Sequence, residues 1–224
     1  MRVRKKKHCE ERIAACGDLI CNDPLSFKGK WREYFSDKLG RDLSGSRLEI
    51  EIGCGKGAFI VETAKRSPDT LFCAVEKVRD VIMLAMEKAL AAQVKNVVFL
   101  NANASFITEY FDTCEADRIY LNFSDPWPKE RCAKRRLTSA GFLEDYRKVL
   151  KKDGGIFFKT DNRGLFDYSV ESFKASGWRL ENITYDLHSS AFAADNVMTE
   201  YEKNFSSKGM PIHRLEAYLD SEIK

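Results

Sequence analysis

Short apolar runs rich in β-branched and aromatic residues alternate with longer amphipathic segments from about residue 47 onward. The short runs favour strands at 47–52, 71–76, 97–101, 118–122 and 155–160. The longer segments favour helices at 58–66, 78–93, 105–111, 139–151 and 164–175. This alternation predicts an α/β fold, a doubly wound and mostly parallel sheet covered by helices on both faces. In such sheets ligands bind at the carboxyl ends of the strands.

The pattern changes after residue 175. Segments 178–187 and 200–206 both resemble strands, and the loop 189–198 joins them without a helix. We expect them to form an antiparallel pair at the sheet edge. Residues 211–219 are compatible with strand or helix. We expect 1–46 to be a basic N-terminal extension packed on the core, ahead of a main domain at 47–224.

Composition narrows the classes of protein. A chain of 224 residues with 44% hydrophobic content can bury a core of its own. Seven cysteines without a Cys-x-x-Cys pair predict neither a disulfide framework nor a metal site, and favour reduced thiols in the cytoplasm. The basic N-terminus is followed by Glu10 and Glu11 rather than an apolar stretch, so we expect no signal peptide. The apolar run 81–92 is too short to span a membrane.

A glycine-rich loop follows the first expected strand. Gly53, Gly55 and Gly57 lie in the segment EIGCGKG, just before the first helix of the main domain. Glycines let the backbone turn sharply and approach a ligand, and a helix N-terminus favours polar or anionic groups. Dinucleotide-binding enzymes use a wider glycine spacing. The tighter spacing resembles the first motif of class I S-adenosylmethionine-dependent methyltransferases, although a simple tight turn remains an alternative.

Two polar residues follow the next strands. Glu76 ends the second strand about 20 residues after the loop, where an acid accepts hydrogen bonds from ribose hydroxyls. Asn103 follows the third strand, where an adenine ring would lie. Its amide group could hydrogen-bond that ring, and a role in a turn fits the pattern equally well.

The segment LNFSDPWPKER at 121–131 joins three chemistries in one loop. Prolines stiffen the backbone, Trp127 can stack on a nucleobase, and Asp125 places an acid beside it. This is the position in which methyltransferases that act on nitrogen carry an Asp/Asn-Pro-Pro-aromatic signature, which Asp125-Pro126-Trp127 resembles. The alternative is a tryptophan that packs in the core.

Three segments together resemble the bacterial tRNA (guanine-N7-)-methyltransferase family, namely LNFSDPWPKERCAKRRLT at 121–138, FKTDNRG at 158–164 and TEYE at 199–202. The resemblance implies a seven-stranded Rossmann-like sheet with an antiparallel edge strand, and methyl transfer from S-adenosyl-L-methionine to guanine N7 in the tRNA variable loop, at position 46. It implies cofactor contacts at Glu51, Gly53, Gly55, Gly57, Glu76, Asn103 and Asp125, with Asp125 also catalytic. It implies substrate contacts at Lys129, Asp161, Thr199, Glu200, Tyr201 and Glu202. The family commonly has Asp where this chain has Asn103.

Elementary chemistry is consistent with that assignment. Guanine N7 carries a lone pair and no proton at neutral pH, so its methylation needs positioning rather than a general base. A carboxylate such as Asp125 would stabilise positive charge that develops on the purine. The Watson–Crick edge of guanine offers two donors to a carboxylate from Asp161, Glu200 or Glu202, and the sequence leaves open which one.

The basic residues after Trp127 are expected to bind the RNA backbone. They are Lys129, Arg131, Lys134, Arg135 and Arg136, and residues 2–7 would form a second basic arm. The alternative for either group is a solvated surface, which the modest net charge of +3 allows.

Other functions remain possible at this point. They are a methyltransferase acting on an amino nitrogen of nucleic acid or protein, a nicotinamide dehydrogenase and a non-catalytic RNA-binding module. We expect tRNA as the partner, no membrane and no metal, and either a monomer or a homodimer.

Overall fold

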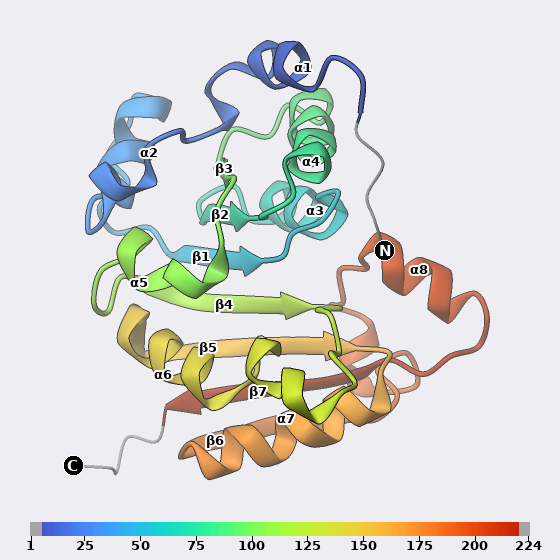
Figure 1. Cartoon of the computed structure of the whole chain (residues 1–224). Helices are drawn as coiled ribbons and strands as arrows, with labels where there is room; N and C mark the ends of the chain where they lie inside the picture. The colour runs from blue at the N-terminus through green and yellow to red at the C-terminus, as the bar shows by residue number, and fades with distance from the viewer. Residues whose placement is uncertain (1–5, 220–224) are drawn as a thin grey trace.

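A computed structural model describes residues 6–219 and contains a seven-stranded sheet in the order β3-β2-β1-β4-β5-β7-β6. The strands are β1 Leu48–Ile52, β2 Leu71–Val75, β3 Val97–Leu100, β4 Ala116–Asn122, β5 Leu150–Thr160, β6 Trp178–Thr184 and β7 His213–Leu219. Strands β1 to β5 pair in parallel, whereas β7 is antiparallel to both β5 and β6. In Figure 1 the arrowheads of β1, β4 and β5 therefore point toward one rim of the sheet and that of β7 points away from it.

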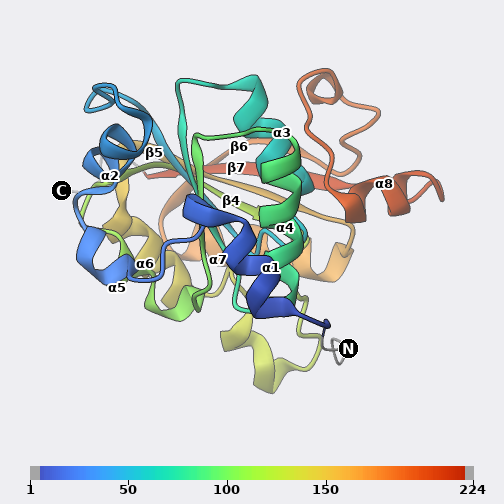
Figure 2. The same cartoon turned by 90° about the horizontal axis from the view of Figure 1, so that it is seen from above.

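Helices cover both faces of the sheet, as the alternating pattern predicts. They are α1 Cys9–Ala15, α2 Trp31–Leu39, α3 Ala58–Arg66, α4 Arg79–Ala91, α5 Ile107–Tyr110, α6 Ala140–Val149, α7 Arg163–Ala175 and α8 Glu200–Ser206. Apolar residues of α1, α3 and α4 share one buried cluster, and those of α2, α5, α6 and α7 share another. Figures 1 and 2 show these two groups of helices around the sheet.

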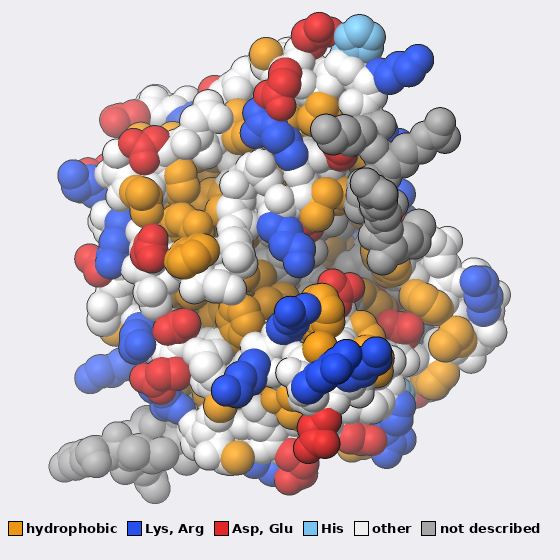
Figure 3. All heavy atoms as spheres, in the orientation of Figure 1, with side chains coloured by type: hydrophobic (Ala, Val, Ile, Leu, Met, Phe, Trp, Pro, Cys, Tyr) orange, Lys and Arg blue, Asp and Glu red, His pale blue; other side chains and the backbone are white. Residues whose placement is uncertain are grey.

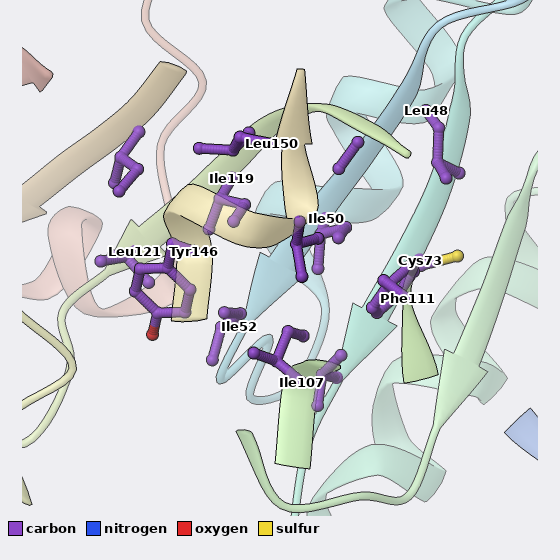
Figure 4. Packing of buried hydrophobic residues seen from close by; sticks show 14 of the residues in the cluster. Leu48, Ile50, Ile52, Cys73, Ile107, Phe111, Ile119, Leu121, Tyr146 and Leu150 are labelled. Carbon is purple, nitrogen blue, oxygen red and sulfur yellow. The ribbon is translucent and has the colours of Figure 1, made fainter. Parts of the chain in front are cut away.

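Successive side chains of a central strand point to opposite faces of the sheet and so contribute to both clusters. Leu71, Cys73 and Val75 of β2 belong to the cluster of α2, α5, α6 and α7, whereas Phe72 and Ala74 belong to the opposite one. A strand that is apolar on both faces is typical of a parallel sheet with helices on each side. Figure 4 shows the cluster of α2, α5, α6 and α7, in which residues of β1, β4 and β5 surround Tyr146 of α6 and Ile107 of α5.

The N-terminal helices belong to the same buried clusters. Trp31 of α2 is fully buried, and its Nε1 donates to the carbonyl oxygen of Tyr110 at 2.8 Å. Arg12 of α1 forms a two-pronged ion pair with Glu87 of α4, with both N–O distances at 2.7 Å. These contacts connect the segment before residue 46 to both faces of the sheet. A domain boundary at 46 stays a prediction. Residues 2–5 of the basic arm lie outside the described range.

One predicted strand is wrong, because residues 200–206 form helix α8. Thr199 caps this helix: its side chain accepts from the backbone N–H of Glu202, and the Glu202 carboxylate accepts from the N–H of Thr199. This reciprocal arrangement is a capping box, and its signature, Thr-x-x-Glu, is present in the sequence. The antiparallel partner of β6 is instead β7, so the open segment 211–219 contains a strand.

Helix α6 ends earlier than the pattern predicts. The expectation was a helix to residue 151, but Leu150 adopts an extended conformation and begins β5. The pairing of β4 with β5 shifts register between Ala116 and Arg118, which absorbs the residues ahead of Gly155 as an irregularity in the strand. None of the helices within residues 6–219 has the length and apolarity needed to cross a bilayer.

Candidate functional site

The chain brings its predicted site residues to one rim of the sheet. Glu76 directly follows β2, Asn103 lies shortly after β3, and Asp161 directly follows β5. Glu51 is the penultimate residue of β1, and Asp125 lies in the loop after β4. Because these strands are parallel neighbours, their carboxyl ends meet at the same edge, where ligands bind in this class of fold. Their roles toward a ligand stay predictions.

The glycine loop connects β1 to α3 in a conformation that only glycine adopts without strain. Gly53, Gly55 and Gly57 all have positive φ, at 76°, 57° and 77°. A Cβ atom on Gly53 or Gly55 would meet open space, which leaves the backbone exposed toward the rim. A Cβ atom on Gly57 would lie 2.7 Å from the Cβ of Ala85, so this glycine lets the loop approach α4 closely.

Glu76 holds this loop in place. Its Oε2 accepts from the N–H of Gly55 at 3.2 Å, and its Oε1 accepts from the N–H of Val78 at 2.9 Å. Each carboxylate oxygen keeps further lone-pair capacity beyond these single bonds. Glu76 is half-buried, so this capacity is open to hydroxyl donors at the rim.

Glu51 is a buried acid with one oxygen in use. Its Oε1 accepts from the side-chain amide of Asn122 at 2.9 Å, whereas its Oε2 is buried and has no partner among the described residues. Burial raises the pKa of Glu51 to about 7, although the bond from Asn122 and the charge of Lys159 act in the opposite direction. A buried carboxylate oxygen without a donor is unusual, and it marks a place where a ligand could donate.

Asn103 is engaged locally. Its Oδ1 accepts from the N–H of Ser105 at 3.1 Å and caps the 3-10 turn Ala104–Phe106. The turn role that the sequence left open is therefore present in this structure. The amide nitrogen makes no hydrogen bond within residues 6–219, so the side chain retains its donors.

Asp125 lies exposed in a loop with two unusual backbone conformations. Phe123 and Trp127 flank it with φ values of 53° and 41°, in a region that bulky residues rarely adopt. The N–H of Phe123 donates to the carbonyl oxygen of Lys159 in β5 at 2.9 Å. Such conformations persist only where surrounding contacts enforce them, and they gather at functional sites.

A basic excursion follows Trp127, and we use this name for residues 128–135. It contains the 3-10 turn Glu130–Arg135 and exposes Lys129, Arg131, Lys134 and Arg135. The guanidinium of Arg135 lies 5.0 Å from the centre of the Trp127 ring. In Figure 3 several Lys and Arg side chains gather over the segment that Figure 1 shows between β4 and α6.

Arg136 differs from the rest of the basic run, because its side chain turns inward. Its Nε donates to the carbonyl oxygen of Pro126 and its Nη2 to that of Trp127, both at 3.1 Å. The guanidinium also lies 4.1 Å from the ring centre of Tyr168 in α7. The sequence predicts an RNA contact here, whereas in this structure the side chain is committed to the loop that carries Asp125.

The segment Thr199–Glu202 borders the site from the far end of the chain. Glu202 is fully buried, and its carboxylate is paired with Nζ of Lys159 at 2.9 Å. That ammonium also donates to Oδ1 of Asn196 and to the carbonyl oxygen of Val197, both at 2.8 Å. Because its oxygens are used within the protein, Glu202 does not offer the open carboxylate that reading a guanine edge requires.

Of the remaining predicted substrate residues, Thr199 is buried as the cap of α8, whereas the others are more open. Tyr201 is 62% exposed, and Asp161 is half-buried at the end of β5. Glu200 pairs with Lys88 of α4, which connects α8 to the helix behind the glycine loop. A cavity of about 400 Å³ lies next to this segment, and Phe59, Asn122, Lys159 and Val197 are among its lining residues.

Lys159 and Asn122 lie at the site although the sequence motifs do not single them out. Lys159 is only 6% exposed, and burial lowers its pKa while the charge of Glu202 acts to raise it. A lysine within the apolar strand FFKT was the available signal, because lysine is almost never buried unless it is paired. The sequence pattern indicates no role for Asn122 beyond ending a strand. Within residues 6–219 no group of three or more His, Cys, Asp or Glu side chains could hold a metal ion.

Solved structures share the fold at low sequence identity. One titled "Crystal Structure of 16S rRNA Methyltranferase KamB" has a TM-score of 0.60 at 12% identity, covering 84% of this chain and 92% of that one. Another, "Structure of an Antibiotic Related Methyltransferase", has a TM-score of 0.57 at 19% identity, covering 81% and 92%. These likenesses confirm the class I methyltransferase type of α/β fold that the pattern and motifs predict.

Sequence relatives are far closer and cover almost the whole chain. A tRNA (guanine-N(7)-)-methyltransferase of Lachnoclostridium phytofermentans is 47% identical over 99% of this chain and 100% of its own. Proteins of the same name from Brevibacillus brevis and Streptococcus pneumoniae are 46% and 45% identical, each over 97% of this chain and at least 98% of their own. A family model described as "Putative methyltransferase" matches residues 46–215. The resemblance carried by the three segments is thereby confirmed, and the chain belongs to the tRNA (guanine-N7-)-methyltransferase family.

Proposed function

We propose that this protein transfers a methyl group from S-adenosylmethionine to N7 of a guanine in tRNA, and that the acceptor is the guanine at position 46 of the variable loop. The carrying observation is identity of 45–47% to proteins named for this activity over nearly the full chain. The rim of the sheet supports the proposal, because it combines a glycine loop, four acids and a basic excursion in one place. We further propose a cytoplasmic location, where tRNA resides.

The residues at the rim fit the cofactor. When bound, S-adenosylmethionine supplies a methyl group on a positively charged sulfur. The open backbone at Gly53 and Gly55 would accommodate it closely, and the unpartnered Oε2 of Glu51 would accept a hydrogen bond from it. Glu76 would accept from ribose hydroxyls while it continues to hold Gly55. Asn103 would donate to the adenine ring through its amide nitrogen, which suits a ring nitrogen.

Asp125 would act on the acceptor. Guanine N7 needs no general base, so the protein's task is to hold the purine in line and to stabilise the charge that develops on it. A carboxylate on a loop held by surrounding contacts does this without reorganising during the reaction. Asp125 is exposed at the rim and therefore reachable by an incoming base.

The choice of carboxylate that reads guanine becomes narrower. Glu202 is buried and paired, and Glu200 pairs with Lys88. Asp161 lies at the end of β5, and none of its carboxylate oxygens is engaged by a side chain in residues 6–219. We therefore assign the Watson–Crick edge to Asp161, with Tyr201 as a stacking surface and Lys129 as a contact to the adjoining phosphate.

The test is incubation with labelled S-adenosylmethionine and an unmodified tRNA. The expected result is one labelled 7-methylguanine, revealed by chain cleavage after borohydride and aniline treatment at position 46. A tRNA with adenine at that position should accept no label. Label in adenine, or in protein alone, would refute the proposal, and cleavage at another guanine would overturn the assigned position while retaining the reaction.

A further inference from the structure

Arg136 closes the basic excursion on itself. The chain leaves the sheet at Asn122, passes Asp125 and Trp127, and returns at Arg136 after the 3-10 turn. Two nitrogens of one guanidinium donate to two successive carbonyl oxygens, those of Pro126 and Trp127. The side chain thus joins the end of the excursion to its beginning, one and two residues after Asp125.

The ring of Tyr168 contacts the same guanidinium. This residue lies in α7, whose neighbouring residues Leu165, Phe166 and Val170 are buried in the core. The guanidinium carbon of Arg136 is 4.1 Å from the Tyr168 ring centre, within the range of a cation–π contact. Arg136 therefore connects the carbonyls of the loop to α7, a helix that is anchored in the core.

The loop needs such a support. Trp127 has a φ of 41°, which is costly for an aromatic residue, and Ser124 has a buried hydroxyl without a partner among the described residues. Strained conformations of this kind persist only where neighbouring contacts enforce them. At the other end of the loop, the N–H of Phe123 donates to the carbonyl oxygen of Lys159. Asp125 therefore lies between two attachments, to β5 and to Arg136.

We propose that Arg136 is a positioning residue, which holds the Asp125 loop through the carbonyls of Pro126 and Trp127, and does not bind an RNA phosphate as its neighbours in the basic run do. This inference rests on the proposed function for the role of Asp125. Its geometric content, the support of the loop, does not depend on the substrate. The planar guanidinium of arginine holds its donors in a rigid fork that matches the two carbonyls, whereas lysine would offer rotatable donors from a single nitrogen and leave the loop less well fixed.

A spectroscopic test needs no substrate. Of the three tryptophans, Trp31 and Trp178 are 0% and 4% exposed, so quenching by acrylamide reports mainly on the half-buried Trp127. Arg136→Gln and Arg136→Lys should both raise the quenching constant. Arg131→Gln, a matched change in the exposed part of the basic run, should not. Equal quenching in the wild type and both Arg136 variants would overturn the proposal.

A kinetic test separates support from phosphate binding. If Arg136 positions the loop, Arg136→Lys and Arg136→Gln both lower kcat by about 10- to 100-fold, the cost of displacing a reacting group by about 1 Å. The KM for tRNA and the dependence of tRNA binding on salt should stay as in the wild type. If Arg136 instead bound a phosphate, lysine would retain activity, and glutamine would lower the logarithmic salt slope by ~0.7.

Two measures keep the outcomes distinct. Unfolding followed by circular dichroism shows whether each variant is folded. If the Arg136 variants are not folded, Tyr168→Leu provides a second test, because it removes the aromatic ring that the Arg136 guanidinium contacts. Tyr168→Leu should lower kcat in the same direction by a smaller factor, and an unchanged kcat would count against the proposal. If the wild type methylates no tRNA, the proposed function fails, while the quenching result still decides whether Arg136 holds the loop.

Discussion

The acids at the rim occupy different environments. Glu51 is buried, with a pKa raised to about 7 by loss of solvent, whereas Asp125 is exposed on a loop. Two carboxyl groups in different surroundings can perform different tasks at one pH. Glu51 suits a fixed contact to a bound molecule, because its position is held by Asn122. Asp125 suits contact with a substrate that arrives from solvent.

The raised pKa of Glu51 makes stability depend on pH. Its pKa is about 7 in the folded protein against an ordinary 4.5, so the folded state binds this proton more tightly. Its contribution is complete below pH 4.5 and is lost as pH rises toward 7, by about 1.4 kcal/mol per unit at most. Glu51→Gln should remove this loss. Urea unfolding of both proteins at pH 5 and pH 7.5 measures it, and parallel declines would contradict the prediction.

Asp125 is expected to affect turnover more than cofactor binding. Asp125→Ala, and the nearly isosteric Asp125→Asn, would remove the anion that we propose stabilises the developing charge. Loss of one such group typically costs about 100- to 1,000-fold in kcat. Calorimetry with S-adenosylmethionine should show affinity within a few-fold of the wild type. Weakened binding with retained kcat would mean that the residue serves the cofactor instead.

Among the elements, α8 depends on contacts that are distant in sequence. Its capping box is local, but Glu202 is also paired with Lys159 of β5, and Glu200 is paired with Lys88 of α4. Nζ of Lys159 additionally holds Asn196 and Val197 of the preceding loop. One buried ammonium thus attaches both the helix and its approach to the sheet beside the candidate site.

Removing this ammonium should be costly. Lys159→Ala leaves the carboxylate of Glu202 buried without its main partner, which typically destabilises a protein by about 3–5 kcal/mol. The double variant Lys159→Met with Glu202→Leu removes both charges and should regain much of that loss, although not the capping contribution of Glu202. Urea unfolding of the single and double variants measures this. A double variant no more stable than Lys159→Ala would show that the ion pair is not the main support.

At the scale of the whole molecule, the net positive charge is small, but basic side chains are clustered in one place. The formal net charge is +3, yet Lys129, Arg131, Lys134 and Arg135 lie exposed in one excursion at the rim. Clustered cations attract a polyanion wherever they gather, irrespective of the net value. Because Arg136 turns inward, we expect only the four exposed basic residues of this excursion to contact the tRNA backbone.

Binding of tRNA should therefore depend on salt with a moderate slope. Four phosphate contacts on irregular RNA predict a logarithmic slope of about −3, from ~0.7 per contact. Fluorescence titrations with tRNA at KCl concentrations from about 50 to about 300 mM would measure this slope. Replacement of all four residues by glutamine should lower the magnitude of the slope by about 3. An unchanged slope in that variant would place the RNA contacts elsewhere.

Local patterns predicted most of the fold. Each of the five strands from 47 to 160 is confirmed, because an apolar run between two helices has few alternatives in a parallel sheet. The prediction of a strand at 200–206 was wrong, because the aromatic residues of this segment favour a strand whereas the Thr-x-x-Glu signal that starts at Thr199 favours a helix, and the helix forms. The end of α6 was predicted too late, because the chain passes directly from Val149 into β5 and does not wait for the glycines at 154 and 155, which often end a helix.

The candidate site divides in the same way. The order of elements and the residues at strand ends follow from the sequence, since parallel strands bring their carboxyl ends to one edge and short motifs occupy those ends. By itself the sequence also determined the family, through segments long enough to be specific. Only the tertiary structure decided that Lys159 is buried, that Glu202 is paired and that Arg136 turns inward while Arg135 stays exposed. These outcomes depend on where α7, α8 and β5 meet, and neighbours in sequence do not encode which side of a loop faces solvent.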